Sequence, residues 1–104
     1  MPSQRTLVIV TLWASSPRAV GIDNAVAYVP PMISAVIHEL ALAGRTGASG
    51  ARLADAAGAA DIYGLVHRAR LHLRRAAPAV AWLHSPAAGL YLLADPMPFI
   101  RLEA

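Results

Sequence analysis

The sequence predicts one α+β domain, with strands at the N-terminus, three helices in the middle and a β-hairpin after them. Three observations lead to this prediction. The chain of 104 residues has the length of a single domain. Apolar and β-branched runs occupy much of residues 6–29. Between residues 31 and 77, apolar residues recur at steps of three and four, the period of an amphipathic helix. The absence of cysteine excludes disulfides and thiolate metal sites.

The N-terminal segment, residues 6–29, reads as three strands. Thr6–Trp13 is rich in β-branched residues and predicts a buried strand. Arg18–Ile22 and Ala25–Val29 are short apolar runs on either side of Asp23-Asn24. Because Asp and Asn tolerate left-handed backbone, this pattern predicts a two-strand ribbon closed by a tight turn.

A secretory signal peptide is the alternative for the same N-terminal segment, because Arg5 precedes the apolar run Leu7–Ala14. The run is short and no small-residue cleavage site follows it, so the strand prediction is preferred. A membrane-spanning helix needs about 20 apolar residues, and the sequence holds no such stretch. We therefore expect a cytoplasmic protein without a membrane segment.

The helical region covers residues 31–77. Pro30-Pro31 can open the first helix, because proline at the first helical position loses no hydrogen bond, and Gly44 is placed to end it with a left-handed cap. Ser49 can cap a short second helix over Gly50–Ala57, with Gly58 ending it. The predicted buried face of the first helix consists of Ile33, Val36, Ile37 and Leu40, and that of the second of Leu53 and Ala57.

The third helix is predicted over Ile62–Ala77, with Asp61 as its N-cap and Pro78 as its terminator. The residues expected on its buried side, spaced by four, three and four, are Ile62, Val66, Ala69 and Leu73.

The hairpin is predicted over residues 79–93, from strands Ala79–His84 and Leu90–Leu93 joined by the turn Ser85–Gly89. Two short helices around a tight turn, followed by such a hairpin, form the outline of a winged helix-turn-helix. Residues 1–94 are therefore expected to be one winged-helix domain with the wing at 79–93. Residues 95–104 contain two prolines and are expected to be an irregular tail, anchored by Phe99 and Ile100.

Positive charge is concentrated in one part of the chain. Residues 45–75 carry a net charge of +4, whereas the rest of the chain carries −1. A positive field confined to one segment suits a phosphate-binding face. The alternative is an arginine-rich helix surface that only contacts solvent.

Three segments resemble the DNA-binding output domain of OmpR/PhoB-type response regulators. The ribbon Val20–Asn24, leading through Val29-Pro30-Pro31 into a helix, is similar to the family's β-ribbon and helix entry. Val66–Leu73, with Arg68 and Arg70, is similar to the family's Ile-Ser-Arg-Leu-Arg-Lys-Lys-Leu run. Gly89–Leu92 lies where the family's wing ends in Gly-Tyr-Arg-Leu. The resemblance spans residues 18–93 and includes neither a receiver domain nor the family's wing arginine, whose place falls near Pro86.

This resemblance implies sequence-specific or architectural binding of double-stranded DNA, with helix 62–77 in the major groove. The expected role is that of a nucleoid-associated regulator of transcription, with a phage or chromosome-associated DNA binder as the alternative. Arg68 and Arg75 lie two turns apart and share a face, and Arg70 and Arg74 lie on an adjoining one. Such arginines contact phosphates or a guanine edge. The full set of expected DNA-contacting residues is Arg52, Tyr63, His67, Arg68, Arg70, Arg74 and Arg75.

Other function classes find little support in the sequence. The four histidines include no pair with helical metal-ligand spacing. The glycine-rich segment Gly44–Gly50 lacks the lysine of a phosphate loop. We expect no enzyme, no cofactor and no small-molecule ligand. We expect a homodimer joined by the first strand or the tail, because one domain offers few phosphate contacts. The alternative function is that of a winged-helix module that binds another protein and not DNA.

Overall fold

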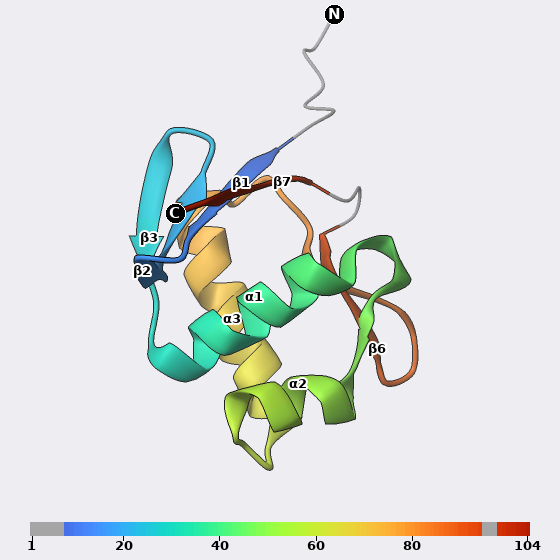
Figure 1. Ribbon diagram of the computed structural model, residues 1–104. Helices are drawn as coiled ribbons and strands as arrows, with labels where there is room; N and C mark the ends of the chain where they lie inside the picture. The colour runs from blue at the N-terminus through green and yellow to red at the C-terminus, as the bar shows by residue number, and fades with distance from the viewer. Residues whose placement is uncertain (1–7, 95–97) are drawn as a thin grey trace, which may run out of the picture.

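The computed structural model describes residues 8–94 and 98–104. Within these residues the chain is an α+β domain of three α-helices and seven strands in two sheets (Figure 1). The elements, in chain order, are β1 (Ile9–Trp13), β2 (Ser16–Ile22), β3 (Ala25–Tyr28), α1 (Pro31–Ala43), the 3₁₀ turn η1 (Gly44–Thr46), β4 (Ala48–Ser49), α2 (Gly50–Ala57), α3 (Ile62–Ala76), β5 (Trp82–Ala87), β6 (Leu90–Ala94) and β7 (Phe99–Glu103).

The first sheet has the strand order β3-β2-β1-β7. The predicted ribbon is confirmed, because β2 and β3 pair antiparallel from Ala19 opposite Tyr28 to Ile22 opposite Ala25. Asp23, in the turn, has the positive φ of 53° that the Asp-Asn pair was expected to supply. Of the predicted first strand, Thr6 and Leu7 lie outside the described residues.

The prediction of an irregular C-terminal tail is wrong. Phe99–Glu103 forms β7, which runs parallel to β1 from Phe99 opposite Ile9 to Glu103 opposite Trp13. Of the two prolines that suggested a tail, Pro98 directly precedes this strand, where it interrupts no ladder bond, and Pro96 lies outside the described residues. On the side of β1 opposite β2, strand β7 supplies hydrogen-bond partners for the backbone groups of β1. Residues 95–97 lie outside the described part of the chain.

The second sheet has the order β4-β6-β5, all antiparallel. The predicted hairpin is confirmed, but its first strand, expected over Ala79–His84, runs from Trp82 to Ala87, so the turn is shorter than expected. The pairing shifts between His84 and Ala87, and a proline is tolerated at such an irregular position because it need not donate a ladder hydrogen bond. The two-residue β4, which pairs with the start of β6, is an element that sequence patterns did not predict.

The helix boundaries follow the predicted signals. Ser49 accepts a hydrogen bond from the Arg52 amide at 3.0 Å, and Gly58 ends α2 in the left-handed conformation. Helix α1 begins at Pro31 as expected. Gly44 ends it with φ 60° and ψ −139°, which is a positive φ without the left-handed helical cap that was predicted.

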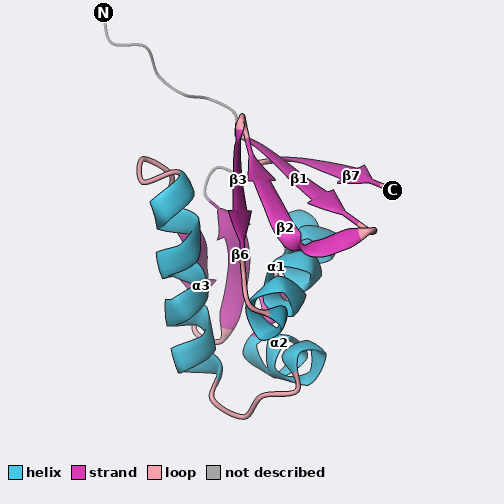
Figure 2. Ribbon diagram, turned by 90° about the vertical axis from the view of Figure 1, so that its left-hand side faces the viewer, coloured by secondary structure: helices cyan, strands magenta, loops and turns pink. Residues whose placement is uncertain are grey.

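The core lies where the three helices meet the inner faces of both sheets. All four residues predicted for the buried face of α1 are at most 2% exposed. Helix α1 contacts β2, β6, α2 and α3, so it is the element around which the domain is assembled. Helix α3 lies on the opposite side of the molecule from β7 (Figure 2). The largest fully buried side chains include Leu12, Ile33, Ile37, Leu40, Leu53, Leu65, Leu73, Leu83 and Leu93.

Candidate nucleic-acid interface on α3

Helix α3 is fixed at its start by the predicted cap. The Asp61 carboxylate accepts from the Gly64 amide at 3.0 Å, which satisfies one of the free amides of the first turn. Gly64 has no side chain at the point where a Cβ would overlap Asp61 Oδ2. The helix continues for 15 residues to Ala76, one residue short of the predicted end.

The buried side of α3 differs by one residue from the prediction. Val66, Ala69 and Leu73 are buried as expected, but Ile62 is only half-buried and Leu65 is fully buried. The predicted stripe started at Ile62 and followed one row of the helix. The contacts that α3 makes with α1, α2 and β5 cover a wider arc than one row. This buried arc fixes which residues face solvent.

The exposed side of α3 carries most of the predicted DNA-contacting residues. Tyr63 is 78% exposed, and the other exposed side chains of this face are His67, Arg68, Leu71, Arg74 and Arg75. We call these six residues the α3 face. Residues 62–76 contain four arginines and no acidic residue. Within the described part of the chain, Arg68, Arg74 and Arg75 form no ion pair and no side-chain hydrogen bond.

Arg70 does not belong to this face, contrary to the expectation that it stands free beside Arg74. Its Nε donates to the Trp82 carbonyl at 3.2 Å and its Nη2 to the Leu83 carbonyl at 2.6 Å. The guanidinium is therefore directed toward the start of β5, and it joins α3 to the second sheet. Spacing along the helix placed Arg70 beside Arg74, but the position of β5 decided its direction.

Arg52, the contact predicted on α2, also has an intramolecular partner. Its Nε lies 2.6 Å from Glu39 Oε1 on α1, and the two side chains are 45% and 24% exposed. This ion pair joins α2 to α1. The carboxylate reduces the positive charge that Arg52 can offer to a phosphate, so five of the seven predicted residues remain as free candidates: Tyr63, His67, Arg68, Arg74 and Arg75.

The hairpin tip carries no charge. Residues 85–89 are Ser, Pro, Ala, Ala and Gly, and all of them are exposed. Any contact that this tip makes with a phosphate would come from backbone amides or the Ser85 hydroxyl. That hydroxyl lies 2.9 Å from each of the carbonyl oxygens of Ala87 and Leu90. The charge available to a polyanion is therefore concentrated on α3.

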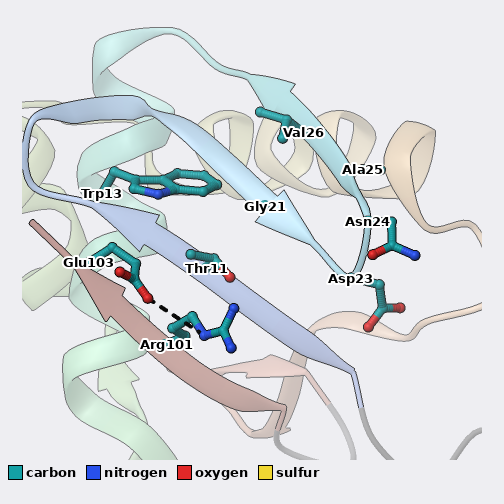
Figure 3. Close-up of a pocket in the computed structure, with 9 residues that line it drawn as sticks. All are labelled: Thr11, Trp13, Gly21, Asp23, Asn24, Ala25, Val26, Arg101 and Glu103. Atoms are coloured by element: carbon teal, nitrogen blue, oxygen red, sulfur yellow. Dashed lines mark ion pairs between the residues drawn. The ribbon is translucent and has the colours of Figure 1, made fainter.

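Another surface feature lies away from α3, on the outer face of the four-stranded sheet. A hollow of about 500 Å³ there is lined by Trp13, Gly21, Asp23, Arg101 and Glu103, among others (Figure 3). The Trp13 ring lies over Gly21, where an added Cβ would be 2.8 Å from the ring. None of the predicted contact residues lines this hollow.

Neither a metal-ligand cluster nor a membrane-spanning helix occurs within residues 8–94 and 98–104. No three or more His, Asp or Glu side chains come together in a way that could hold a metal ion. No helix among these residues has the length and apolar character needed to cross a membrane.

Comparisons with protein-family models, with curated proteins and with solved structures give no match.

Proposed function

We propose that this protein binds double-stranded DNA by placing the α3 face in the major groove, as a winged-helix regulator of transcription in the nucleoid. One observation carries the proposal: three arginines without partners among the described residues project from one exposed helix face, while the opposite face of that helix is buried. Free guanidinium groups on a rigid helix are pre-positioned to bind phosphates or guanine edges.

The arrangement of the arginines suits a groove with two phosphate walls. At 100° per residue, Arg68 and Arg75 lie on one flank of the α3 face, and Arg74 lies on the other with Tyr63 and His67. An α-helix with its side chains is about 10–12 Å wide, and the major groove is about 12 Å wide. The two flanks, one of them including Tyr63, can therefore reach opposite phosphate backbones, and His67, the residue of its flank nearest the centre of the face, is available to a base edge.

The element order supports the same proposal. Helices α2 and α3 are joined by four residues and are followed by the β5–β6 hairpin, which is the order of a winged helix-turn-helix and of the OmpR/PhoB-type domains that the sequence resembles. The uncharged hairpin tip departs from that family. We therefore propose major-groove contact by α3 without insertion of a wing arginine into the minor groove.

Fluorescence anisotropy with a labelled random-sequence duplex tests the proposal. If each of the three arginines neutralises one phosphate, log K falls against log salt with a slope of about −2.7 per chain, because each phosphate contributes about −0.9. Arg68→Ala should reduce the slope by about 0.9 and weaken binding to all sequences.

Arg45→Ala is the matched control, because Arg45 is an exposed arginine in η1, at the end of α1 away from α3 (Figure 1). This variant loses the same charge and should keep the wild-type slope. Absence of duplex binding at low salt, or equal effects of Arg68→Ala and Arg45→Ala, would refute the role of the α3 face in DNA binding.

A protein-binding module is the second candidate function, and one observation favours it. Leu71, at the centre of the α3 face, is 40% exposed, and an apolar centre with a charged rim is typical of protein interfaces. Such a partner would be acidic. Leu71→Ala separates the two functions, because it removes the apolar centre and leaves every arginine. It should leave the affinity for random duplex within about twofold, whereas it would weaken a protein partner held by a buried centre.

A further inference from the structure

Strand β7 forms one edge of the first sheet, and no strand of residues 8–94 or 98–104 pairs with its outer side. It is the last strand in the order β3-β2-β1-β7. On its inner side, the Phe99 amide donates to the Val8 carbonyl and the Glu103 carbonyl accepts from the Ala14 amide, both at 2.9 Å. In a strand, alternate residues direct their amide and carbonyl to the same neighbour. Residues 99, 101 and 103 therefore bond to β1, and Ile100 and Leu102 direct their backbone groups outward.

The side chains of β7 other than Ile100 are also exposed. Phe99 is 56% and Leu102 is 64% exposed, and no described strand pairs with the outer side of β7. An exposed five-residue edge with apolar side chains is a template for pairing with another strand. The charges on this strand indicate which partner it fits.

We propose that two copies of this protein associate through β7, as an antiparallel pair centred on Leu102. Backbone geometry restricts the register. In an antiparallel pair, the two residues that exchange hydrogen bonds must both have outward-directed groups. A two-fold axis can then pass through a residue but not between residues, since that would oppose an outward-directed residue with an inward-directed one. Axes through the three central residues Ile100, Arg101 and Leu102 give the longest overlap of the two strands.

Charge and proline select among these three registers. An axis through Arg101 would place the two copies of Arg101 directly opposite one another, and like charges in that position are destabilising. An axis through Ile100 would place Pro98 opposite Leu102, and Pro98 has no amide hydrogen to donate to the outward carbonyl of Leu102. An axis through Leu102 places Arg101 of each copy opposite Glu103 of the other.

The favoured register is self-complementary. Arg101 and Glu103 lie on the same face of β7, where Arg101 Nε is 3.6 Å from Glu103 Oε2 (Figure 3). In the proposed dimer these two charges and their copies would form a square in which every neighbour has the opposite sign. Residues that do not exchange hydrogen bonds have the closest side chains, and Arg101 and Glu103 would be such a pair. A strand whose reversed copy complements its own charges fits a second copy of the same chain.

This dimer leaves the α3 face accessible, since β7 and α3 lie on opposite sides of the molecule (Figure 2). The inference does not depend on the proposed function, because the association can be measured without DNA. The sequence predicts a homodimer, and the β7 pairing proposed here defines its interface.

Sedimentation equilibrium over a range of protein concentrations tests the inference. The wild-type chain of 10.9 kDa should approach twice that mass as its concentration rises. Arg101→Glu and Glu103→Arg should each weaken self-association about tenfold or more, because each places like charges opposite one another twice. Arg45→Glu is the control with the same change of charge in η1, which is not part of the first sheet, and it should associate as the wild type does.

Two further measurements test the register. An equimolar mixture of the Arg101→Glu and Glu103→Arg chains should recover the dimer mass, because each supplies the charges that the other needs. Leu102→Pro removes an outward amide without removing a bond to β1, and it should abolish association while circular dichroism stays unchanged. A wild-type mass that stays monomeric, or a mixture that stays monomeric, would overturn the inference.

Discussion

The bond between Arg70 and the start of β5 should contribute strongly to stability. Leu83 is fully buried and has a φ of 55°, a left-handed conformation that costs a residue with a Cβ about 1–2 kcal/mol. In a regular strand, successive carbonyls point to opposite edges, but here the carbonyls of Trp82 and Leu83 both accept from Arg70. The guanidinium therefore stabilises an unfavourable backbone conformation.

The two hydrogen bonds of Arg70 set the size of its contribution to the free energy of unfolding. Hydrogen bonds to charged groups contribute about 1.5–3 kcal/mol each. Arg70 is half-buried, so water would replace part of the loss after truncation. We expect Arg70→Ala to lower the free energy of unfolding by about 2–3 kcal/mol, and thereby to lower Tm by roughly 10–20 °C for a domain of this size.

Urea unfolding followed by tryptophan fluorescence measures this change, because Trp82 lies in the affected segment and its indole donates to the Ala77 carbonyl at 3.0 Å. Arg74→Ala is the matched control, since Arg74 is an exposed arginine of the same helix that forms no ion pair or side-chain hydrogen bond with the described residues. It should change the free energy of unfolding by no more than about 0.5 kcal/mol. Equal stability of the Arg70→Ala and Arg74→Ala variants would show that the two hydrogen bonds do not support the left-handed turn.

Three other substitutions test the packing and the backbone by the same unfolding measurement. Leu65→Ala should cost about 2–5 kcal/mol, because Leu65 is fully buried, whereas Leu71→Ala should cost much less; similar costs would contradict the assigned orientation of α3. Asp61→Ala should cost about 1 kcal/mol through loss of the N-cap, and full stability of this variant would show that the cap is dispensable. Gly47→Ala should destabilise the fold by more than about 1 kcal/mol. Gly47 has a φ of 76°, and an added Cβ would lie 2.8 Å from the Tyr91 carbonyl oxygen. An unchanged Tm would contradict this contact.

Much of the fold follows from local signals that act within a few residues. The prolines at the start of α1, Ser49 before α2 and Asp61 before α3 each satisfy or remove free amides of a first helical turn. The Asp23-Asn24 turn closes the ribbon for a similarly local reason. Such signals are readable in sequence because their energies depend on the immediate backbone.

Elements that depend on distant partners were missed or misplaced. Strand β7 forms because β1 offers a free edge, and the two strands are separated by almost the whole chain. The short β4 exists only through its pairing with β6. Neither strand has a local pattern strong enough to predict it, since strand pairing is a tertiary interaction.

The residues of the candidate site also fall into two groups, those whose position follows from local spacing and those whose position depends on distant contacts. Sequence spacing correctly placed Arg68, Arg74 and Arg75 on the exposed side of α3, because the helical period relates them to the buried residues. It could not show that Arg70 would bond to β5, or that Arg52 would pair with Glu39. Whether a guanidinium is free depends on which carbonyls and carboxylates the fold brings near it.

The sequence by itself determined the α+β class, the ends of the three helices and the concentration of arginine on α3, because each of these depends on residues close together in the chain. The tertiary structure decided which of those arginines remain available to a partner and that β7 completes the first sheet while leaving its outer edge open. These outcomes depend on contacts between segments far apart in the chain, and the periodicity of a single segment carries no information about them.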